Sequence, residues 1–428
     1  MRAPLFVLGV ALLAVAAAAG NTASSGANSH WYSLVAPTTI NQTSNQCRPS
    51  APVASTPEDA VKIVKDLKKT TKKSYKIAIF APYMANSQVI FNKRVGEELL
   101  KAGHDVTIYM MTILDMKMHK VDIDPRIKLI TVNGSFGMDG EKMMAEQAKS
   151  AFHDLPFWSA ESRKLMSMFG EMYKSCKVIV KDKNFLSHIE ESKYDIAFTH
   201  MYNFCPIGII HQTKIPTWIW MSSGALIDNM ANLMGVPVPP SYCSPLMMDA
   251  GDKLTFIERI KSFTGHIMFN VLWKRMTANK ETEVFREEFG DDFPDLTDLA
   301  AKAPLVMVNS NELYDFARPT LSKIINIGGI GIINKDSKPL KPEFANLVEK
   351  AKGVVVMSFG SLAPMYLMPE HWKEAYFHAF AQFPNVQFFL RYEKPEEIAD
   401  ILPPNAYASK WLPQTDLLLH PKTLGLIS

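Results

Sequence analysis

Short apolar runs alternate with amphipathic stretches in the first half of the chain. The apolar runs have the length of buried strands and stand at Lys76–Phe80, His104–Tyr109, Ile127–Val132, Tyr194–Thr199 and Thr217–Met221. Ala81–Ser87 is predicted to be a loop, and the stretch that follows it repeats apolar residues on one face of a helix that Gly103 ends. Strands that alternate with helices predict a parallel α/β domain.

The same pattern returns near the end of the chain. A buried run at Val354–Met357 precedes a helical pattern, and a second buried run follows at Val386–Leu390. Between the two halves, Ile325–Gly331 has the composition of a strand that leads into a hinge. We therefore predict the fold class α/β, with two Rossmann-like domains facing a cleft, the first over 75–330 and the second, incomplete, over 331–428.

The residues before the first buried run lack the apolar periodicity that is typical of a folded core. Residues 1–20 begin with a positive charge, continue with an apolar run and end in small residues, which predicts a cleaved signal peptide. Residues 21–74 are predicted to form a low-complexity extension that ends in a Lys-rich helix. A signal peptide implies entry to the endoplasmic reticulum, where the sequences at Asn41 and Asn133 are glycosylation acceptors.

Composition excludes several classes of function. The chain has 46 Lys and Arg residues against 43 Asp and Glu, so no strong field attracts nucleic acid. The cysteines are Cys47, Cys176, Cys205 and Cys243, and their spacing is too wide for a zinc site. They allow one disulfide without defining which pair forms it, and no other motif predicts a metal.

Two motifs in the last quarter of the chain combine a turn after a strand with an aromatic–amide pair. Val-Val-Met-Ser-Phe-Gly-Ser ends at Ser361, and Trp-Leu-Pro-Gln-Thr-Asp-Leu-Leu begins at Trp411. A small turn after a strand lets backbone N–H groups approach phosphate oxygens. The indole of Trp411 offers a stacking face and Gln414 a bidentate amide, which suits a nucleobase and its ribose. The alternative is that Trp411 is a core residue and Ser361 only ends a strand.

Together these motifs closely resemble the donor half of UDP-glycosyltransferases, above all the nematode-type UDP-glucuronosyltransferases, and the resemblance runs from Tyr75 to Ser428. It implies a GT-B type fold and UDP-glucuronate or another UDP-sugar as co-substrate, with no other cofactor. It also implies that Ser361 contacts the diphosphate, Trp411 the uracil ring and Gln414 the ribose or uracil. The His-Gly-Gly motif and the sugar-binding Asp-Gln pair of the family would follow Ser428.

The chain departs from the family at both catalytic positions. In the family, the base is a His after the first strand, and its partner acid ends the fourth strand. Counting back from Gly103 and His104, the base position is occupied by Gln88, and the acid position by His200. Glutamine cannot accept and hold a proton at neutral pH. His200 is a candidate for a relocated base if its ring reaches the acceptor; the alternative is a satisfied pocket histidine.

An enzyme and a non-catalytic protein both remain open at this point. The first hypothesis is an inverting, UDP-glucuronosyltransferase-like transfer of a hexosyl group to a hydroxyl of a small lipophilic acceptor. The second is a non-catalytic family member, or a fragment, that binds acceptors or pairs with active relatives as a homo- or hetero-oligomer. The apolar stretch 254–273 is predicted to be helical and either to line the acceptor pocket with peripheral membrane contact or to be an ordinary core helix. We expect the protein in the endoplasmic reticulum lumen or secretory pathway, membrane-anchored only if a longer form exists.

Overall fold

The structure is a computed structural model that describes residues 73–84, 86–115, 122–152, 160–246, 248, 250–313, 315–331, 338–360 and 363–428. The predicted signal peptide, nearly all of the predicted extension, Asn41 and Ser361 lie outside these residues. What the sequence predicts for them stays a prediction.

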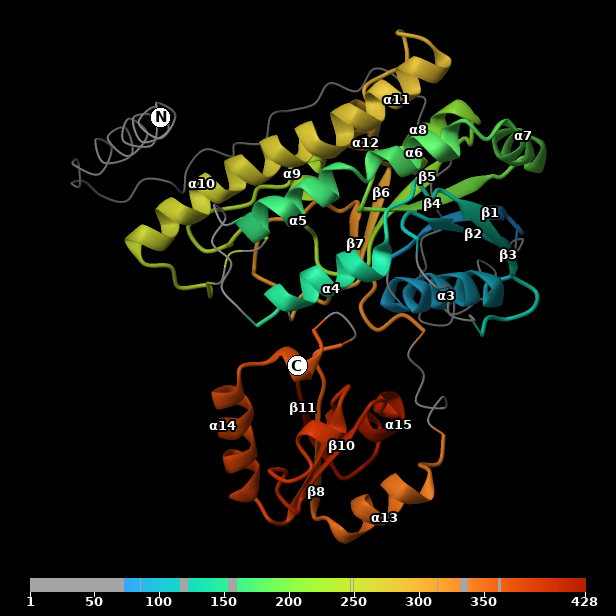
Figure 1. The fold of residues 1–428 in the computed structure, drawn as a ribbon. Coiled ribbons are helices and arrows are strands. Elements are labelled where there is room, and N and C mark those ends of the chain that lie inside the picture. The colour runs from blue at the N-terminus through green and yellow to red at the C-terminus, as the bar shows by residue number, and fades with distance from the viewer. Residues whose placement is uncertain are drawn as a thin grey trace, which may run out of the picture. The chain divides into compact units, whose positions relative to one another are not determined.

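A seven-stranded sheet, in which every pair of neighbours is parallel, forms the centre of the first domain (Figure 1). Its strands are β1 (Lys76–Tyr83), β2 (Asp105–Thr112), β3 (Lys128–Asn133), β4 (Ile196–His200), β5 (Trp218–Ser222), β6 (Leu305–Val308) and β7 (Ile324–Asn326). The order β3-β2-β1-β4-β5-β6-β7 reverses direction between β1 and β4, as in a doubly wound sheet. The prediction of a parallel α/β domain is therefore confirmed.

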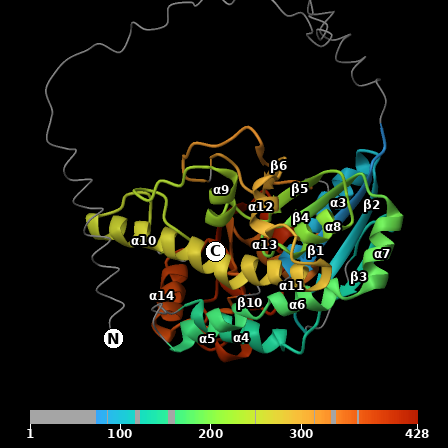
Figure 2. The same cartoon turned by 90° about the horizontal axis from the view of Figure 1, so that it is seen from above.

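Helices cover both faces of this sheet (Figures 1 and 2). On one face, Phe91 and Val95 of α3 are buried against Ile79 of the central strand. On the other face, a larger core joins Phe80 and Tyr109 to residues of α6, α7, α8, α11 and α12. The helices of this half of the chain are α3 (Asn86–Lys101), α4 (Gly140–Ser150), α5 (Ala160–Gly170), α6 (Tyr173–Val180), α7 (Lys183–Ser192), α8 (Cys205–Gln212), α9 (Asp228–Met234), α10 (Phe256–Trp273), α11 (Asn279–Phe289) and α12 (Leu296–Ala301).

Pairing with neighbours lengthens or creates strands that the local pattern does not predict. The sequence predicts a loop over Ala81–Ser87, whereas β1 continues to Tyr83, which pairs with Thr112 at the end of β2. β6 is not predicted at all, because its four residues are too few for a clear pattern. It forms a strand because parallel ladders to β5 and β7 satisfy its backbone on both sides.

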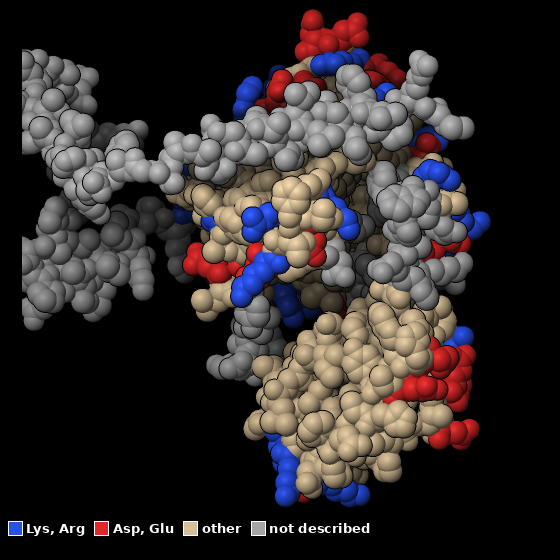
Figure 3. Space-filling model, turned by 90° about the vertical axis from the view of Figure 1, so that its left-hand side faces the viewer, with Lys and Arg blue, Asp and Glu red and all other residues tan. Residues whose placement is uncertain are grey.

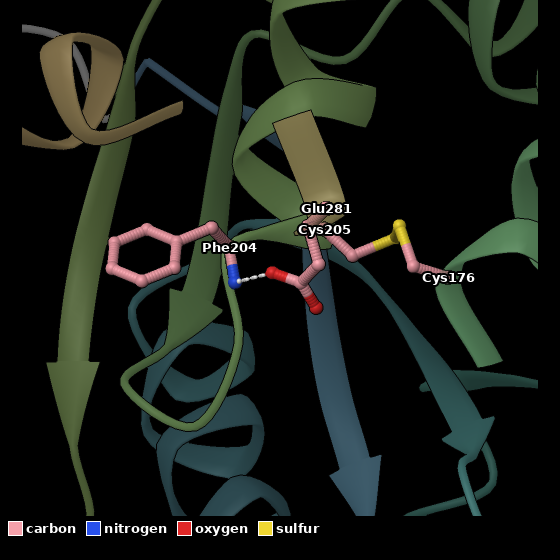
Figure 4. Close-up of a disulfide and its surroundings, with 4 residues drawn as sticks. All are labelled: Cys176, Phe204, Cys205 and Glu281. Carbon is pink, nitrogen blue, oxygen red and sulfur yellow. Dashed lines mark hydrogen bonds between the residues drawn. A yellow bond between two sulfur atoms is a disulfide. The ribbon is translucent and has the colours of Figure 1, made fainter. Parts of the chain in front are cut away.

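A disulfide and a buried carboxyl group fix the start of α8 (Figure 4). Cys176 of α6 is bonded to Cys205, the first residue of α8, across a sequence separation of 29 residues. Closing a loop of this length contributes on the order of 3 kcal/mol in the chain-entropy account. The Oε2 atom of Glu281 in α11 accepts a hydrogen bond from the Phe204 N–H at 2.7 Å. Burial raises the pKa of Glu281 to about 8, although the N–H groups of Phe204 and Cys205 oppose the shift.

A second sheet lies in the last quarter of the chain. Its four parallel strands have the order β10-β9-β8-β11. The elements are α13 (Pro342–Lys350), β8 (Gly353–Met357), α14 (Glu370–Ala381), β9 (Val386–Arg391), β10 (Ala406–Ser409), α15 (Gln414–Leu418) and β11 (Thr423–Ile427). Separate apolar cores lie on the two faces, one around Phe388 and Leu390, the other around Val356 and Phe389. On the face in Figure 3, charged side chains of this domain gather at its margins.

The segment Pro239–Phe269 groups by its contacts apart from both sheets. Within it, the proline-rich loop packs on the first half of α10. The absence of a side chain at Gly265 lets Pro245 approach, because a Cβ there would lie 2.8 Å from the proline ring. His266 donates from Nε2 to the carbonyl oxygen of Cys243 at 2.9 Å. In the described part of the chain, no helix has the length and apolar character that crossing a membrane requires.

Candidate active site

Polar side chains gather at the carboxyl edge of the first sheet, where the strand order reverses between β1 and β4. Gln88 lies in the first turn of α3, which follows β1, and His200 is the last residue of β4. Tyr202 follows β4, Ser223 follows β5 and Asn309 follows β6. Ligands of open parallel sheets bind outside this edge at such a reversal. The sequence therefore places the family's base and acid positions at the point where the topology predicts a ligand.

A pocket of about 300 Å³ opens at this edge. It is lined by Ser87, Gln88, Ile90, Phe91, Arg94, Ser223, Asn309, Gly329 and Ile330. This size is at the lower end of the range for small-molecule sites, and the mixture of apolar walls with a few polar groups is typical of them. Gln88 is thus a lining residue of the pocket, whereas His200 is not.

Gln88 belongs to a hydrogen-bonded chain that links the ends of three strands. Its Nε2 donates to the hydroxyl oxygen of Tyr202 at 2.5 Å. Because the Tyr202 oxygen accepts this bond, its own proton is free to donate to Ser223 Oγ, which lies 2.9 Å away. The Oε1 atom of Gln88 is buried and has no hydrogen-bond partner among the described residues. An unpaired buried acceptor costs about 1–3 kcal/mol, and in this side-chain conformation the oxygen is closed to solvent.

His200 is hydrogen-bonded to Asn92, which lies one turn after Gln88 in α3. The Nδ2 group of Asn92 donates to the backbone oxygen of Gln88 at 2.8 Å, so Asn92 Oδ1 is the acceptor for His200 Nε2 at 2.7 Å. Burial lowers the pKa of His200 to about 3, which keeps the imidazole neutral at physiological pH. His200 therefore acts on the pocket through its neighbours: Asn92 links it to the backbone of Gln88, and its ring packs edge-on against Phe91, with centroids 5.7 Å apart. It is a positioning residue.

The lining of the pocket contains one ionisable side chain, Arg94. The hydroxyl and amide groups of Ser87, Gln88, Ser223 and Asn309 can donate and accept hydrogen bonds but cannot hold a proton at neutral pH. Burial raises the pKa of Tyr202, whose hydroxyl oxygen accepts the hydrogen bond from Gln88 Nε2. The described lining can therefore bind and orient a hydroxyl group, and it contains no general base of the usual kind.

The turn after β8 begins at Ser358. Ser358 is buried and its N–H donates to the Ile427 carbonyl oxygen at 3.0 Å, which ties the turn to β11. Gly360 has a φ of +74°, a backbone conformation that favours glycine. The next residue, Ser361, is outside the described residues, and its contact with a diphosphate stays a prediction.

Trp411 projects from the loop after β10, and its side chain is mostly open to solvent, with 65% of its surface exposed. The alternative that Trp411 is a core residue is therefore wrong. The guanidinium of Arg391, the last residue of β9, lies 5.1 Å from the centroid of the indole ring and supports it by a cation–π contact. Buried Leu412 and Leu417 anchor the loop on either side of half-buried Gln414. An exposed indole with one supported face is suited to stacking on a flat ring.

Asn133, the glycosylation position within the described residues, is the last residue of β3 and is exposed. Its Oδ1 accepts a hydrogen bond from the Ser135 N–H at 3.0 Å. Across the described part of the chain, no cluster of His, Cys, Asp and Glu has the geometry to hold a metal ion.

A family model described as UDP-glucoronosyl and UDP-glucosyl transferase matches residues 78–428. The chain belongs to this family. The Caenorhabditis elegans protein ugt-47, whose name assigns it to the UDP-glucuronosyltransferases, is 27% identical over 83% of this chain and 66% of its own length. Human UDP-glucuronosyltransferase 2B7 is 28% identical over 78% of this chain and 63% of its own length.

The chain spans about two thirds of the length of these UDP-glycosyltransferase relatives. Among solved structures, a UDP-glucosyltransferase from Polygonum tinctorium, capable of glucosylating indoxyl and in complex with 3,4-dichloroaniline, is 13% identical. The likeness covers 83% of this chain and 76% of that chain, with a TM-score of 0.48.

Sequence reasoning missed four residues of the first edge: Arg94, Tyr202, Ser223 and Asn309. Two of them follow predicted strands directly, so the rule that ligands bind at carboxyl ends could have found Tyr202 and Ser223. Asn309 required the unpredicted strand β6. For Arg94 the sequence carries no signal, because a single basic residue on a helix is most often on a solvated face.

Proposed function

We propose that this UDP-glycosyltransferase family member transfers a hexosyl group, with inversion, from UDP-glucuronate or another UDP-sugar to a hydroxyl of a small lipophilic acceptor. The acceptor oxygen forms a bond to the anomeric carbon, the bond from that carbon to the diphosphate breaks, and UDP leaves with the electron pair. The exposed indole of Trp411, held by Arg391 at the end of the second sheet, carries the proposal. It has the chemistry to stack on uracil, with Gln414 beside it for the ribose.

The pocket at the first edge suits the acceptor. Ile90, Phe91 and Ile330 supply apolar wall, and Gln88 can accept a hydrogen bond from the acceptor hydroxyl once its side chain turns the unpaired Oε1 toward the pocket. Gln88 cannot take the proton itself, so in this proposal the proton passes to water as the new bond forms. A positioned general base contributes about a hundredfold to ten-thousandfold in rate, and we expect transfer to be slower than in relatives that have one by a factor in this range.

A second candidate function is binding without catalysis, in which the protein holds acceptors or pairs with active relatives as a homo- or hetero-oligomer. The observation that favours it is the absence, among the described lining residues, of a side chain able to accept a proton at neutral pH. In this reading, His200 only positions the helix that carries Gln88.

Turnover and binding assays with the same ligands separate the two functions. The 428-residue chain, and the longest protein that its gene encodes, are incubated with 4-nitrophenol and either UDP-glucuronate or UDP-glucose. Glycoside formation supports the transferase. Binding of UDP and the phenol by calorimetry with no product supports the non-catalytic protein. If the folded protein binds neither UDP nor the phenol, both proposals fail.

We also propose that the protein works in the lumen of the endoplasmic reticulum or the secretory pathway, with Asn41 and Asn133 as glycosylation sites. The disulfide is consistent with an oxidising compartment, and Asn133 is exposed as an acceptor must be. Exposed apolar residues on α10, among them Phe256 and Ile267, support the proposal of peripheral membrane contact.

A further inference from the structure

Arg94 lies in the wall of the acceptor pocket, on the helix whose first turn carries Gln88. The segment after β7 packs along its aliphatic stem, since a Cβ at Gly331 would lie 2.8 Å from Arg94 Cβ. Gly331 has a φ of +67°, a conformation that glycine adopts readily, so the chain can pass this close to the arginine. The stem is therefore held by backbone, and Arg94 is one of the residues that line the pocket.

The charge of Arg94 has no protein partner among the described residues. The acidic residues one turn further along α3 are Glu97 and Glu98, and both are already engaged by lysines. Glu97 pairs with Lys93 at 3.7 Å, and Glu98 pairs with Lys101 at 2.8 Å. The other lining residues are neutral. A half-buried guanidinium without a carboxylate is a binding group for a planar anion, because its N–H donors match the two oxygens of a carboxylate.

We propose that Arg94 makes the pocket selective for ligands that carry a carboxylate as well as a hydroxyl, that is, for aromatic hydroxy acids and related acidic acceptors. The carboxylate binds the Arg94 guanidinium, and the hydroxyl donates to Gln88 Oε1 once the side chain turns this buried, unpaired atom toward the pocket. Ile90 and Phe91 contact the apolar body between these two groups. This inference rests on the proposed function, because it takes the pocket to be the acceptor site.

The test compares two ligands that differ only in charge, 4-hydroxybenzoate and 4-hydroxybenzamide, by calorimetry in the absence of any donor. A hydrogen bond to a charged group discriminates by roughly tenfold to a hundredfold, so we expect the acid to bind at least tenfold more tightly than the amide. Arg94→Gln should abolish this preference, and Arg94→Lys should retain part of it. Lys302→Gln is the control, because it removes a positive charge at an exposed position outside the pocket, keeps Lys93 paired with Glu97, and should leave the preference intact.

Two results would overturn the inference. The first is equal binding of the acid and the amide by the wild-type protein. The second is a preference that survives in Arg94→Gln. A third arm compares UDP-glucuronate with UDP-glucose: if Arg94→Gln weakens only UDP-glucuronate, the carboxylate that Arg94 binds belongs to the donor sugar, and the acceptor assignment is wrong.

Failure of this inference is distinguishable from failure of the proposed function. Charge-selective binding without turnover would support the carboxylate site and contradict the transferase function. Turnover of neutral and acidic phenols at equal kcat/KM, unchanged in Arg94→Gln, would support the transferase function and contradict the carboxylate site.

Discussion

The carboxyl edges of the two sheets have the same topology and opposite character. Each sheet reverses its strand order beside its first strand, at β1 and β4 in one and at β8 and β11 in the other. At the first edge, Tyr202 is hydrogen-bonded to Gln88 and to Ser223, which both line a small pocket. At the second edge, Trp411 stands open to solvent with Arg391 against its ring.

The two edges differ in how their residues compare with the motifs that the resemblance assigns to the family. The second edge has Trp411 and Gln414, which the resemblance assigns to the nucleotide. At the position that the resemblance assigns to the base, the first edge has Gln88, whose amide is hydrogen-bonded to Tyr202. In a parallel sheet, strand order fixes where the carboxyl ends of the strands meet, whereas single side chains fix the chemistry that is possible there.

The largest expected effect comes from making the first edge resemble that of the family. Gln88→His places an imidazole at the pocket, within reach of the Tyr202 hydroxyl that now accepts from Gln88. We expect kcat with a phenol to rise about a hundredfold to ten-thousandfold, and to increase with pH through about 6.5 as the imidazole loses its proton. Gln88→Asn is the control. Rates that stay unchanged in Gln88→His would place the reaction centre elsewhere.

The second-largest expected effect concerns Trp411, at the carboxyl edge of the second sheet. Trp411→Ala removes the stacking face and should weaken UDP binding, measured by calorimetry, about fivefold to a hundredfold, since stacking on an aromatic side chain contributes about 1–3 kcal/mol per base. Trp411→Phe should lose less. Trp372→Ala, which removes another exposed indole of the same domain, should have no effect. If Trp411→Ala binds UDP with the wild-type affinity, Trp411 does not form a nucleotide site at the second edge.

The smallest effect concerns Glu281, whose buried carboxyl group accepts a hydrogen bond from Phe204 at the start of α8. Glu281 has a folded pKa of about 8 and an unfolded value of about 4.3, so it is protonated in the fold and ionised after unfolding at neutral pH. Unfolding therefore releases a proton, and stability should fall as pH rises from about 4.5 to 8, by up to about 1.4 kcal/mol per pH unit. His200 has the opposite sign: its folded pKa lies below the unfolded value of about 6.5, and its contribution is lost as pH falls below 6.5.

Between about pH 6.5 and 8, the slope from these two groups belongs to Glu281 alone. Urea denaturation across this window should show falling stability in the wild-type protein and a flatter profile in Glu281→Gln, whose amide oxygen can still accept from Phe204. Glu283→Gln, at an exposed position of the same helix, is the control. An equal slope in Glu281→Gln and wild type would show that the carboxyl is ionised in the fold.

The sequence by itself determined the class of the fold, the family and the motif that contains Trp411 and Gln414. These features are local, because a strand, a helix or a turn is specified by residues close together in the chain. Only the tertiary structure decided that Gln88 binds Tyr202, 114 residues away, and that His200 binds Asn92 rather than a ligand. The same holds for Arg94, whose ligand-binding role arises from Gly331 and from lysines that occupy the nearby carboxylates. Such contacts depend on strand order, which brings distant residues to one edge of a sheet and which no local pattern records.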